Sequence, residues 1–258
     1  MIHYVLILAA GKGSRLTNSR TPKQFLELDH LPLIMHSAIA FKKADPKSEL
    51  YIALPNGYKL EWRRLCKKYN FNIEHKIYTG GIRRFDTVFK GLKTIYKTMS
   101  SKEKSSNTNN IKSHSLISIH DAARPFINSD FILELINSAT RNGSAVPVIK
   151  LKNSLREFAG IQEAQSLGRD RNNYISTQTP QVFTLDSIYK AYCQLIELEK
   201  SNNNNPFFDD ASVYDYLNNK LPINLINGRE YNIKITTDLD YYLAQKIYNF
   251  LKKRDEKL

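Results

Sequence analysis

A cation-rich loop near the N-terminus has the residue types and spacing of an anion-binding site. An aliphatic run, His3–Leu8, predicts a buried strand, and Gly11 and Gly13 follow it. Successive backbone N–H groups in such a turn form a concavity that binds anions. Three cations add positive charge beside this turn: Lys12, Arg15 and Lys23. The loop therefore predicts a site for a polyphosphate.

Two common phosphate-binding loops do not fit this spacing. The GxxxxGK[ST] pattern of a P-loop is absent, and Leu16 stands where a dinucleotide fingerprint has its third glycine. On the glycines alone, an ordinary tight turn between a strand and a helix remains an alternative. Pro22, Lys23 and Gln24 favour the anion site, because packing does not explain a proline-stiffened turn that gathers cations.

A second pair of glycines, Gly80 and Gly81, follows the strand expected at residues 74–78 and precedes Thr87. Glycines let a flat ring approach the backbone closely, and a hydroxyl can read the polar edge of that ring. A helix that simply begins after a Gly-Gly turn is the alternative. Because the carboxyl ends of parallel strands share one edge of a sheet, this loop should lie beside the first one.

Asp121 lies at the end of the next expected strand, residues 115–119, and small residues follow it. A carboxylate in this place suits Mg²⁺, which takes one or two protein carboxylates and completes its shell with water and phosphate oxygens. Arg124 offers bidentate recognition of an anion nearby. An aspartate that only caps the turn is the alternative.

Two segments near the C-terminus carry further charges. Lys234 lies within residues 232–236, which alternate like a short core strand, so its charge should lie at an edge or beside an anion. Asp209 and Asp210 precede an expected helix, and at least one of them should cap it; the sequence leaves open whether either is catalytic. The six histidines lack metal-ligand spacing, so zinc is not expected.

Strand-like and helix-like segments alternate along the chain, which predicts βαβ units and a mostly parallel α/β sheet. Strands are expected at residues 3–8, 49–54, 74–78, 115–119, 144–148 and 232–236. Helices are expected at residues 33–43, 58–69, 84–98, 129–141 and 237–251, the last with Thr236 or Thr237 as its N-cap. Ligands in such sheets bind outside the carboxyl ends of the strands, where the loops above lie.

Three stretches interrupt this alternation. Residues 99–115 are polar and low in complexity, so we expect a long exposed loop, with a shorter one at residues 201–206. Residues 150–175 carry arginines and some alternating apolar residues, which suits a protruding β-hairpin. No linker divides the sequence, so residues 1–258 are expected to form a single domain.

Composition narrows the class of protein. The net charge is +13, but the basic residues are scattered and do not form a stripe with interleaved aromatics, so nucleic-acid binding is not favoured. No apolar run reaches the roughly 18 residues of a membrane span, and the N-terminus lacks the features of a signal peptide. Cys66 and Cys193 lie far apart without framework spacing, so reduced thiols in the cytoplasm are expected.

Six motifs, taken in order, resemble those of the 2-C-methyl-D-erythritol 4-phosphate cytidylyltransferase family over nearly the whole chain. They are AAGKGSR with PKQF, GGIRRFDTV, HDAARPF, QTPQVF, DDAS and NIKIT. The resemblance implies a Rossmann-like nucleotidyltransferase fold and a homodimer joined by a β-arm at residues 150–175. It also implies transfer of CMP from CTP to methylerythritol phosphate, with Mg²⁺ or another divalent cation, in the non-mevalonate isoprenoid pathway.

The resemblance further implies roles for individual residues. The catalytic residues it implies are Arg15, Lys23 and Lys234. The CTP-binding residues are Ala9, Ala10, Gly11, Lys12, Gly13, Gly81, Arg84, Thr87 and Asp121, with Asp121 also the metal ligand. The substrate-binding residues are Arg124, Ser154, Arg171 and Thr179, of which Ser154 and Arg171 would reach the partner's substrate from the arm.

Departures from the family pattern leave alternatives open. Asn153 and Ser154 replace an Asp-Thr or Asp-Ser pair, and Phe208 stands where Thr is often found. A ribitol-5-phosphate cytidylyltransferase is the nearest alternative, although its members tend to vary HDAARP and DDAS, which are intact here. A non-catalytic nucleotide-binding protein is more remote, because simple binding would not require Lys23, Asp121 and Lys234 together.

Overall fold

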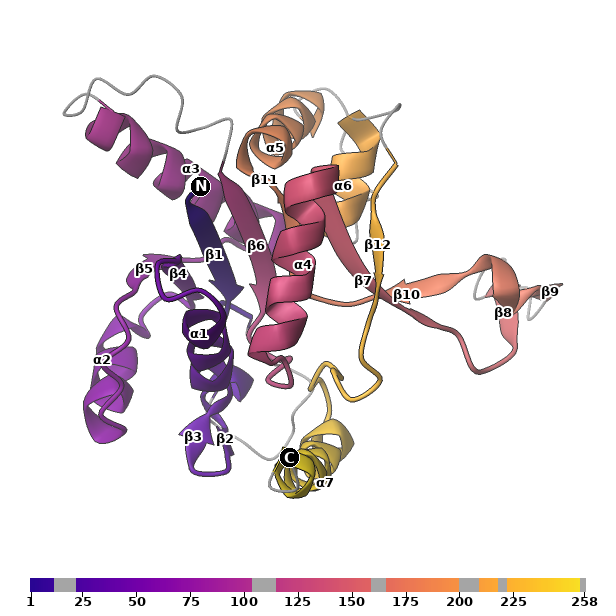
Figure 1. The fold of residues 1–258 in the computed structure, drawn as a ribbon, viewed down its shortest axis with the longest axis horizontal. Coiled ribbons are helices and arrows are strands. Elements are labelled where there is room, and N and C mark those ends of the chain that lie inside the picture. The colour runs from indigo at the N-terminus through magenta and orange to yellow at the C-terminus, as the bar shows by residue number, and fades with distance from the viewer. Residues whose placement is uncertain (12–21, 104–114, 159–165, 200–208, 218–221, 256–258) are drawn as a thin grey trace.

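The computed structural model describes residues 1–11, 22–103, 115–158, 166–199, 209–217 and 222–255. Its centre is an eight-stranded sheet (Figure 1). In spatial order the strands are β10 (Ile175–Thr177), β7 (Ser144–Lys150), β11 (Gln181–Thr184), β6 (Leu116–Asp121), β1 (His3–Leu8), β4 (Glu49–Leu54) and β5 (Lys76–Thr79), with β12 (Leu225–Asn227) also paired to β7.

The part of the sheet around β1 is parallel, as the alternation of strands and helices predicts. β1 pairs in parallel with β4 on one side and β6 on the other, and β4 pairs in parallel with β5. At its carboxyl end Leu8 lies opposite both Ala53 and Asp121. The chain runs from β1 to β4 on one side and later returns to β6 on the other side of β1. The carboxyl end of β1 is therefore the switch point, where α/β sheets bind ligands.

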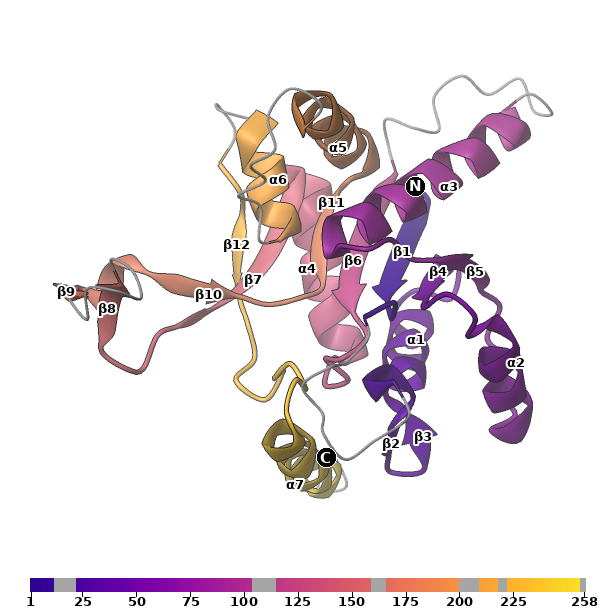
Figure 2. The ribbon, with the colours of Figure 1, turned by 180° about the vertical axis from the view of Figure 1, so that it is seen from behind.

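Helices cover both faces of the sheet (Figures 1 and 2). Those on one face are α1 (Leu33–Ala44), α2 (Lys59–Lys68) and α4 (Ser129–Asn142), and those on the other are α3 (Arg84–Glu103), α5 (Leu185–Glu199) and α6 (Asp210–Leu217). The last helix, α7 (Asp238–Asp255), packs against the region of β2 (Glu27–Leu28), which forms a small hairpin with β3 (Leu31–Pro32). No helix among the described residues is long and apolar enough to cross a membrane.

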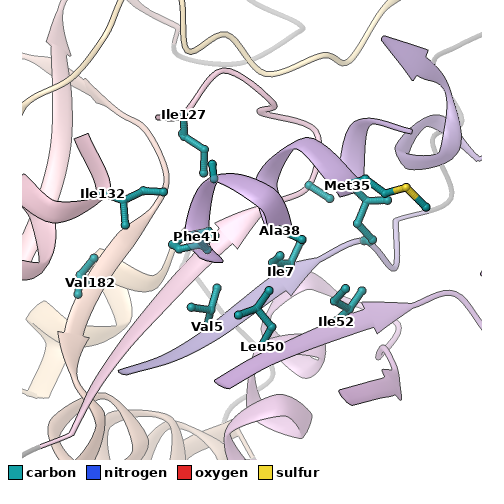
Figure 3. Packing of buried hydrophobic residues seen from close by; sticks show 14 of the residues in the cluster. Val5, Ile7, Met35, Ala38, Phe41, Leu50, Ile52, Ile127, Ile132 and Val182 are labelled. Atoms are coloured by element: carbon teal, nitrogen blue, oxygen red, sulfur yellow. The ribbon is translucent and has the colours of Figure 1, made fainter. Parts of the chain in front are cut away.

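The core divides into two layers because successive side chains of a strand point to opposite faces. In β1, Val5 and Ile7 pack on the side of α1 and α4 (Figure 3), whereas Tyr4 and Leu6 pack on the side of α3 and α5. All four side chains are buried. β1 is therefore held from both sides, which makes it a rigid support for the loop at its carboxyl end.

Local signals set the ends of the helices. Asn128 caps α4, its side chain accepting a hydrogen bond from the N–H of Phe131 (3.0 Å), and Gly143 ends that helix with φ of 78°, which glycine adopts readily. At α7 the expected N-cap is confirmed as Thr237. Its hydroxyl accepts from the N–H of Asp240, whose carboxylate accepts from the N–H of Thr237 in return.

Two expectations about secondary structure are wrong in part. Residues 99–103 continue α3 instead of opening a loop; residues 104–114 and 201–206 lie outside the described residues. Residues 232–236 do not form a strand. The N–H of Ile235 donates to the carbonyl of Ala123 (2.9 Å) and the carbonyl of Asn232 accepts from Arg124 (2.7 Å), so the segment is tied to a loop and not to a sheet edge.

Residues 155–169 contain a β-hairpin that stands away from the main sheet (Figure 1). Its strands, β8 (Leu155–Phe158) and β9 (Ser166–Arg169), pair antiparallel, and the single turn η3 (Arg171–Asn173) leads back to β10. Phe158 and Leu167 expose 61% and 65% of their surface. The two side chains lie on opposite faces of the hairpin, because Phe158 is paired with Ser166 and Leu167 with Glu157.

Candidate active site

A cavity of about 190 Å³ opens at the carboxyl edge of the sheet, where the sequence places its chemistry. Segments far apart in the chain line it, and the sequence-predicted residues among them are Ala9, Ala10, Gly11, Lys23, Gly81, Arg84, Thr87, Asp121 and Lys234. A larger hollow, about 800 Å³, lies between α1, α4 and α7, and none of the sequence-predicted site residues lines it. The structure thus gathers most of the predicted triphosphate and base site in one place.

Lys23 is held at the cavity by the short helix η1 (Lys23–Phe25). The next residue, Gln24, is buried and donates from its amide nitrogen to the carbonyl of Ala9 (2.6 Å), which ties η1 to the end of β1. Phe25 stacks on Trp62 at 6.2 Å between ring centroids. Lys23 itself donates from Nζ to the carbonyl of Ile235 (3.1 Å), so its ammonium group is anchored in the cavity wall.

Gly80 and Gly81 lie where any side chain would clash with neighbouring atoms. A Cβ on Gly80 would lie 2.2 Å from Cβ of Ala10, and one on Gly81 would lie 2.3 Å from Cβ of Asp86. The N–H of Gly81 donates to the hydroxyl of Thr87 (2.9 Å), which donates in turn to the carbonyl of Arg83 (3.1 Å). The glycines therefore let the start of α3 fold tightly against the first loop.

Gly81→Ala is expected to destabilise the protein by about 1–3 kcal/mol and to raise KM for the CTP that the sequence resemblance implies, because overpacking moves the backbone that lines the cavity. Its Cβ would also lie 2.8 Å from the carbonyl carbon of Asp86 and 3.0 Å from the backbone N of Thr87, neither of which can rotate away. Urea unfolding and steady-state kinetics measure the two effects. Gly168→Ala is the control, because its Cβ would come no closer than 4.0 Å to a neighbour, the end of the Arg156 side chain; equal behaviour of the two variants would contradict the prediction.

Asp121 is the anionic centre of the cavity. Its Oδ2 lies 2.7 Å from Nζ of Lys234, and its Oδ1 accepts from Nε of Arg84 at 3.3 Å. Burial by itself raises the pKa of this carboxyl, but the charges of Arg84 and Lys234 outweigh it and hold the pKa well below its ordinary value. Asp121 is therefore ionised, and the expectation that Lys234 lies beside an anion is confirmed.

The two aspartates of the DDAS motif have different roles. Asp209 is the helix cap: its Oδ1 accepts from the N–H of Ser212 (2.9 Å), and its own N–H donates to the hydroxyl of Ser212 (3.3 Å). Asp210 is fully buried and accepts from Arg84 (2.6 Å) and from the hydroxyl of Tyr192 (2.6 Å). The sequence could not distinguish these roles, because both residues precede the same helix.

His120 supports Asp121 from behind and was not singled out from the sequence. Its Nδ1 lies 3.1 Å from the hydroxyl of Thr179, and its Nε2 lies 3.2 Å from the hydroxyl of Ser37 and 3.1 Å from the carbonyl of Arg124. The Thr179 hydroxyl also accepts from the N–H of Asp121 (3.1 Å). Thr179, predicted to bind substrate, is buried behind Asp121 and does not line the cavity.

His120 should make folding stability sensitive to mild acid. Burial lowers its pKa from the ordinary 6.5 to about 3, so the folded protein keeps it neutral while the unfolded chain binds a proton. The free energy of unfolding should therefore fall as pH drops below about 6.5, by up to roughly 1.4 kcal/mol per pH unit. Urea denaturation at pH 7, 6 and 5 measures this slope. A slope unchanged in His120→Gln would contradict the assignment. His36, whose pKa burial also lowers, contributes to the slope that remains in that variant.

The other predicted residues that the structure describes do not line this cavity. Arg124 donates from Nη1 to the carbonyl of Asn232 (2.7 Å), and its Nε is buried without a hydrogen-bond partner among the described residues. Ser154, just before β8, and Arg171, in η3 just after β9, are both exposed, and Arg171 donates to the carbonyl of Lys152. Lys12, Gly13 and Arg15 lie outside the described residues.

Comparison with known proteins agrees with this arrangement. A family model described as 2-C-methyl-D-erythritol 4-phosphate cytidylyltransferase matches residues 3–249. Proteins of that name from Bacteroides fragilis and Bacteroides thetaiotaomicron are 34% and 33% identical to this chain, over 96% and 94% of it and 100% and 98% of their own lengths.

Solved structures show the same similarity. The crystal structure of a 2-C-methyl-D-erythritol 4-phosphate cytidylyltransferase from Thermus thermophilus matches with a TM-score of 0.69 and 25% identity, over 96% of this chain and 98% of that one. A 4-diphosphocytidyl-2C-methyl-D-erythritol synthase from Anaerococcus prevotii, 19% identical, shares the fold with a TM-score of 0.73 over 96% of each chain. The chain belongs to the 2-C-methyl-D-erythritol 4-phosphate cytidylyltransferase family.

Proposed function

We propose that this protein transfers the cytidylyl group of CTP to 2-C-methyl-D-erythritol 4-phosphate and releases pyrophosphate. One observation carries the proposal: in a chain of this family, Lys23, Arg84, Lys234 and Asp121 meet in one cavity at the switch point of the sheet. Even with Asp121 and Asp210 both paired to these cations, a net positive charge remains at the site, and it attracts anions such as a triphosphate and a phosphate monoester.

In the reaction a phosphate oxygen of the alcohol phosphate attacks the α-phosphorus of CTP, the bond from that phosphorus to the bridging oxygen breaks, and pyrophosphate leaves. The protein has little covalent work to do, so positioning and charge neutralisation supply most of the rate. Lys23 and Lys234 line the cavity on two separate segments, which suits them to hold the two anions. Arg15 is proposed to join them at the triphosphate.

A divalent cation, Mg²⁺ in the simplest case, fits the donors at this site. Asp121 supplies one ionised carboxylate at the cavity, and the described residues hold no cluster of three or more His, Cys, Asp or Glu that would bind a metal by themselves. Mg²⁺ commonly binds in this way, through one carboxylate and the phosphates of the substrate. When bound, it would neutralise charge on the triphosphate.

Pyrophosphate release tests the activity directly. The protein is incubated with CTP and Mg²⁺, in parallel with methylerythritol phosphate, with ribitol 5-phosphate and with neither. We expect release with methylerythritol phosphate alone. Release with ribitol 5-phosphate alone would identify ribitol 5-phosphate as the substrate in place of methylerythritol phosphate. No release with either compound would favour a binding protein without turnover.

We further propose that the enzyme is a homodimer whose hairpin places Ser154 and Arg171 at the partner's substrate. The projecting position of β8 and β9 and their exposed apolar side chains support this. Lys23→Ala and Arg171→Ala should each be inactive, and their refolded 1:1 mixture should regain about a quarter of wild-type activity, because half of its dimers carry one intact site. A mixture as inactive as its components would contradict the shared site.

We propose the cytoplasm as the location of this enzyme. Cys66 and Cys193 both carry free thiols, as expected where proteins are kept reduced. Burial raises the pKa of Cys66 to about 11, so that thiol is unreactive near neutral pH.

A further inference from the structure

Asp210 is a buried charge that the proposed mechanism does not use. It is the first residue of α6 and has no exposed surface. An ionised carboxylate in such a place needs partners that hold its charge, because burial in a medium of low polarity is costly. Its partners are Nη2 of Arg84, at 2.6 Å from Oδ2, and the hydroxyl of Tyr192, which donates to Oδ1 at 2.6 Å.

Arg84 connects this buried charge to the cavity. It is the first residue of α3 and lines the cavity, and its Nε donates to Oδ1 of Asp121 at 3.3 Å. The guanidinium therefore lies between two carboxylates, one in the core and one at the site. Burial lowers the pKa of Arg84, but Asp210 and Asp121 outweigh it and raise the pKa well above its ordinary value, so the group stays charged.

The geometry separates Asp210 from any ligand. Asp210 does not line the cavity, so it can act on a nucleotide only through Arg84. Tyr192 is fixed in turn: it is 1% exposed, and its ring stacks on Phe85, the neighbour of Arg84, at 4.7 Å between centroids. The planar guanidinium has a rigid fork of donors, so holding one edge determines where the other edge points.

We propose that Asp210, fixed by Tyr192, is a positioning residue that holds Arg84 in the orientation in which it binds the triphosphate of CTP. The inference rests on the proposed function. Among the described residues, Asp121 is the other carboxylate that contacts Arg84. Without the negative charge of Asp210, the guanidinium of Arg84 would turn toward Asp121. The resulting ion pair would leave Arg84 less able to bind CTP and Asp121 less able to bind the metal.

The main test is Asp210→Asn, which keeps the shape of the side chain and removes its charge. We expect KM for CTP to rise about 10-fold or more, as is typical when a supporting contact of a ligand-binding group is lost, while KM for methylerythritol phosphate stays within about twofold. A merely structural role would lower the amount of folded enzyme, and so Vmax, without changing KM for CTP. That outcome would overturn the inference.

Tyr192→Phe keeps the test falsifiable if Asp210→Asn does not fold. It removes only the hydroxyl that donates a hydrogen bond to Asp210. It should raise KM for CTP in the same direction by a smaller factor. Tyr214→Phe is the matched control: Tyr214 lies on α6, is 3% exposed and hydrogen-bonds Ser187, away from Arg84. Equal changes of KM for CTP in the two variants would contradict the inference.

A double variant shows whether Asp210 acts through Arg84. Arg84→Met alone should lower kcat/KM for CTP, and adding Asp210→Asn or Tyr192→Phe should then lower it by less than about twofold more. Losses that multiply would mean that Asp210 acts independently of Arg84. Wild-type enzyme in the same assay separates the two questions: if it is inactive with methylerythritol phosphate the proposed function fails, whereas multiplying losses beside an active wild type overturn only this inference.

Discussion

Lys23→Ala is expected to lower kcat by about 100-fold or more, the loss typical when one charged donor to a transition state is removed. Lys23 lines the cavity, and the carbonyl of Ile235 holds its ammonium group there at 3.1 Å. During attack on the α-phosphorus, negative charge moves onto the departing pyrophosphate. A fixed ammonium group stabilises that charge more than it stabilises bound CTP, so kcat should fall further than KM rises.

The control for Lys23→Ala is Lys76→Ala. Lys76 begins β5 and pairs with Glu49 (3.0 Å) at the opposite edge of the sheet, so its removal takes away a similar charge far from the cavity. Thermal unfolding of both variants shows whether lost activity reflects lost structure. Near-normal turnover by folded Lys23→Ala, or an equal loss in Lys76→Ala, would contradict the role of Lys23 in the transition state.

The place of the site could be predicted from the sequence because it depends on the pairing of strands. An aliphatic run that ends at Leu8 and another that ends near Asp121 predict two buried strands, and parallel pairing sets their carboxyl ends side by side. The register confirms this, with Leu8 opposite Asp121. Lys23 could be found because a proline-stiffened turn with a lysine in it has no packing explanation.

Contacts between distant segments could not be predicted. Arg84 and Asp210 are 126 positions apart, and no local pattern says that the first residues of α3 and α6 meet. The alternation of residues 232–236 predicts a strand, and that prediction is wrong. The backbone of this segment hydrogen-bonds to Ala123 and Arg124 in a loop and does not pair with a neighbouring strand. The sequence also does not show that the glycine pair lies against atoms of Ala10 and Asp86, which only the fold brings close.

Asp121→Asn is expected to lower kcat/KM by about 100-fold or more. The substitution keeps the size of the side chain but removes the charge that Lys234 (2.7 Å) and Arg84 (3.3 Å) contact. Lys234 therefore loses the anion that orders it, whereas Asp210 still holds Arg84. The substitution also removes the carboxylate proposed to hold the metal. This lowers kcat/KM further, beyond the tens-fold decrease expected from the loss of a supporting contact alone. A neutral amide is a much weaker ligand for Mg²⁺ than a carboxylate.

Two measurements separate these losses. A Mg²⁺ titration of activity should shift to higher concentration in Asp121→Asn, and CTP binding without metal, followed by calorimetry, should change less, because the variant cavity has lost a negative charge that repels the triphosphate. Asp130→Asn, at the exposed start of α4, is the control. An unshifted Mg²⁺ dependence would remove Asp121 from the metal site. Because the two cations hold its pKa well below the ordinary value, Asp121 is ionised at every pH near neutrality, so a loss of wild-type activity between pH 8 and 6 would have to come from another group.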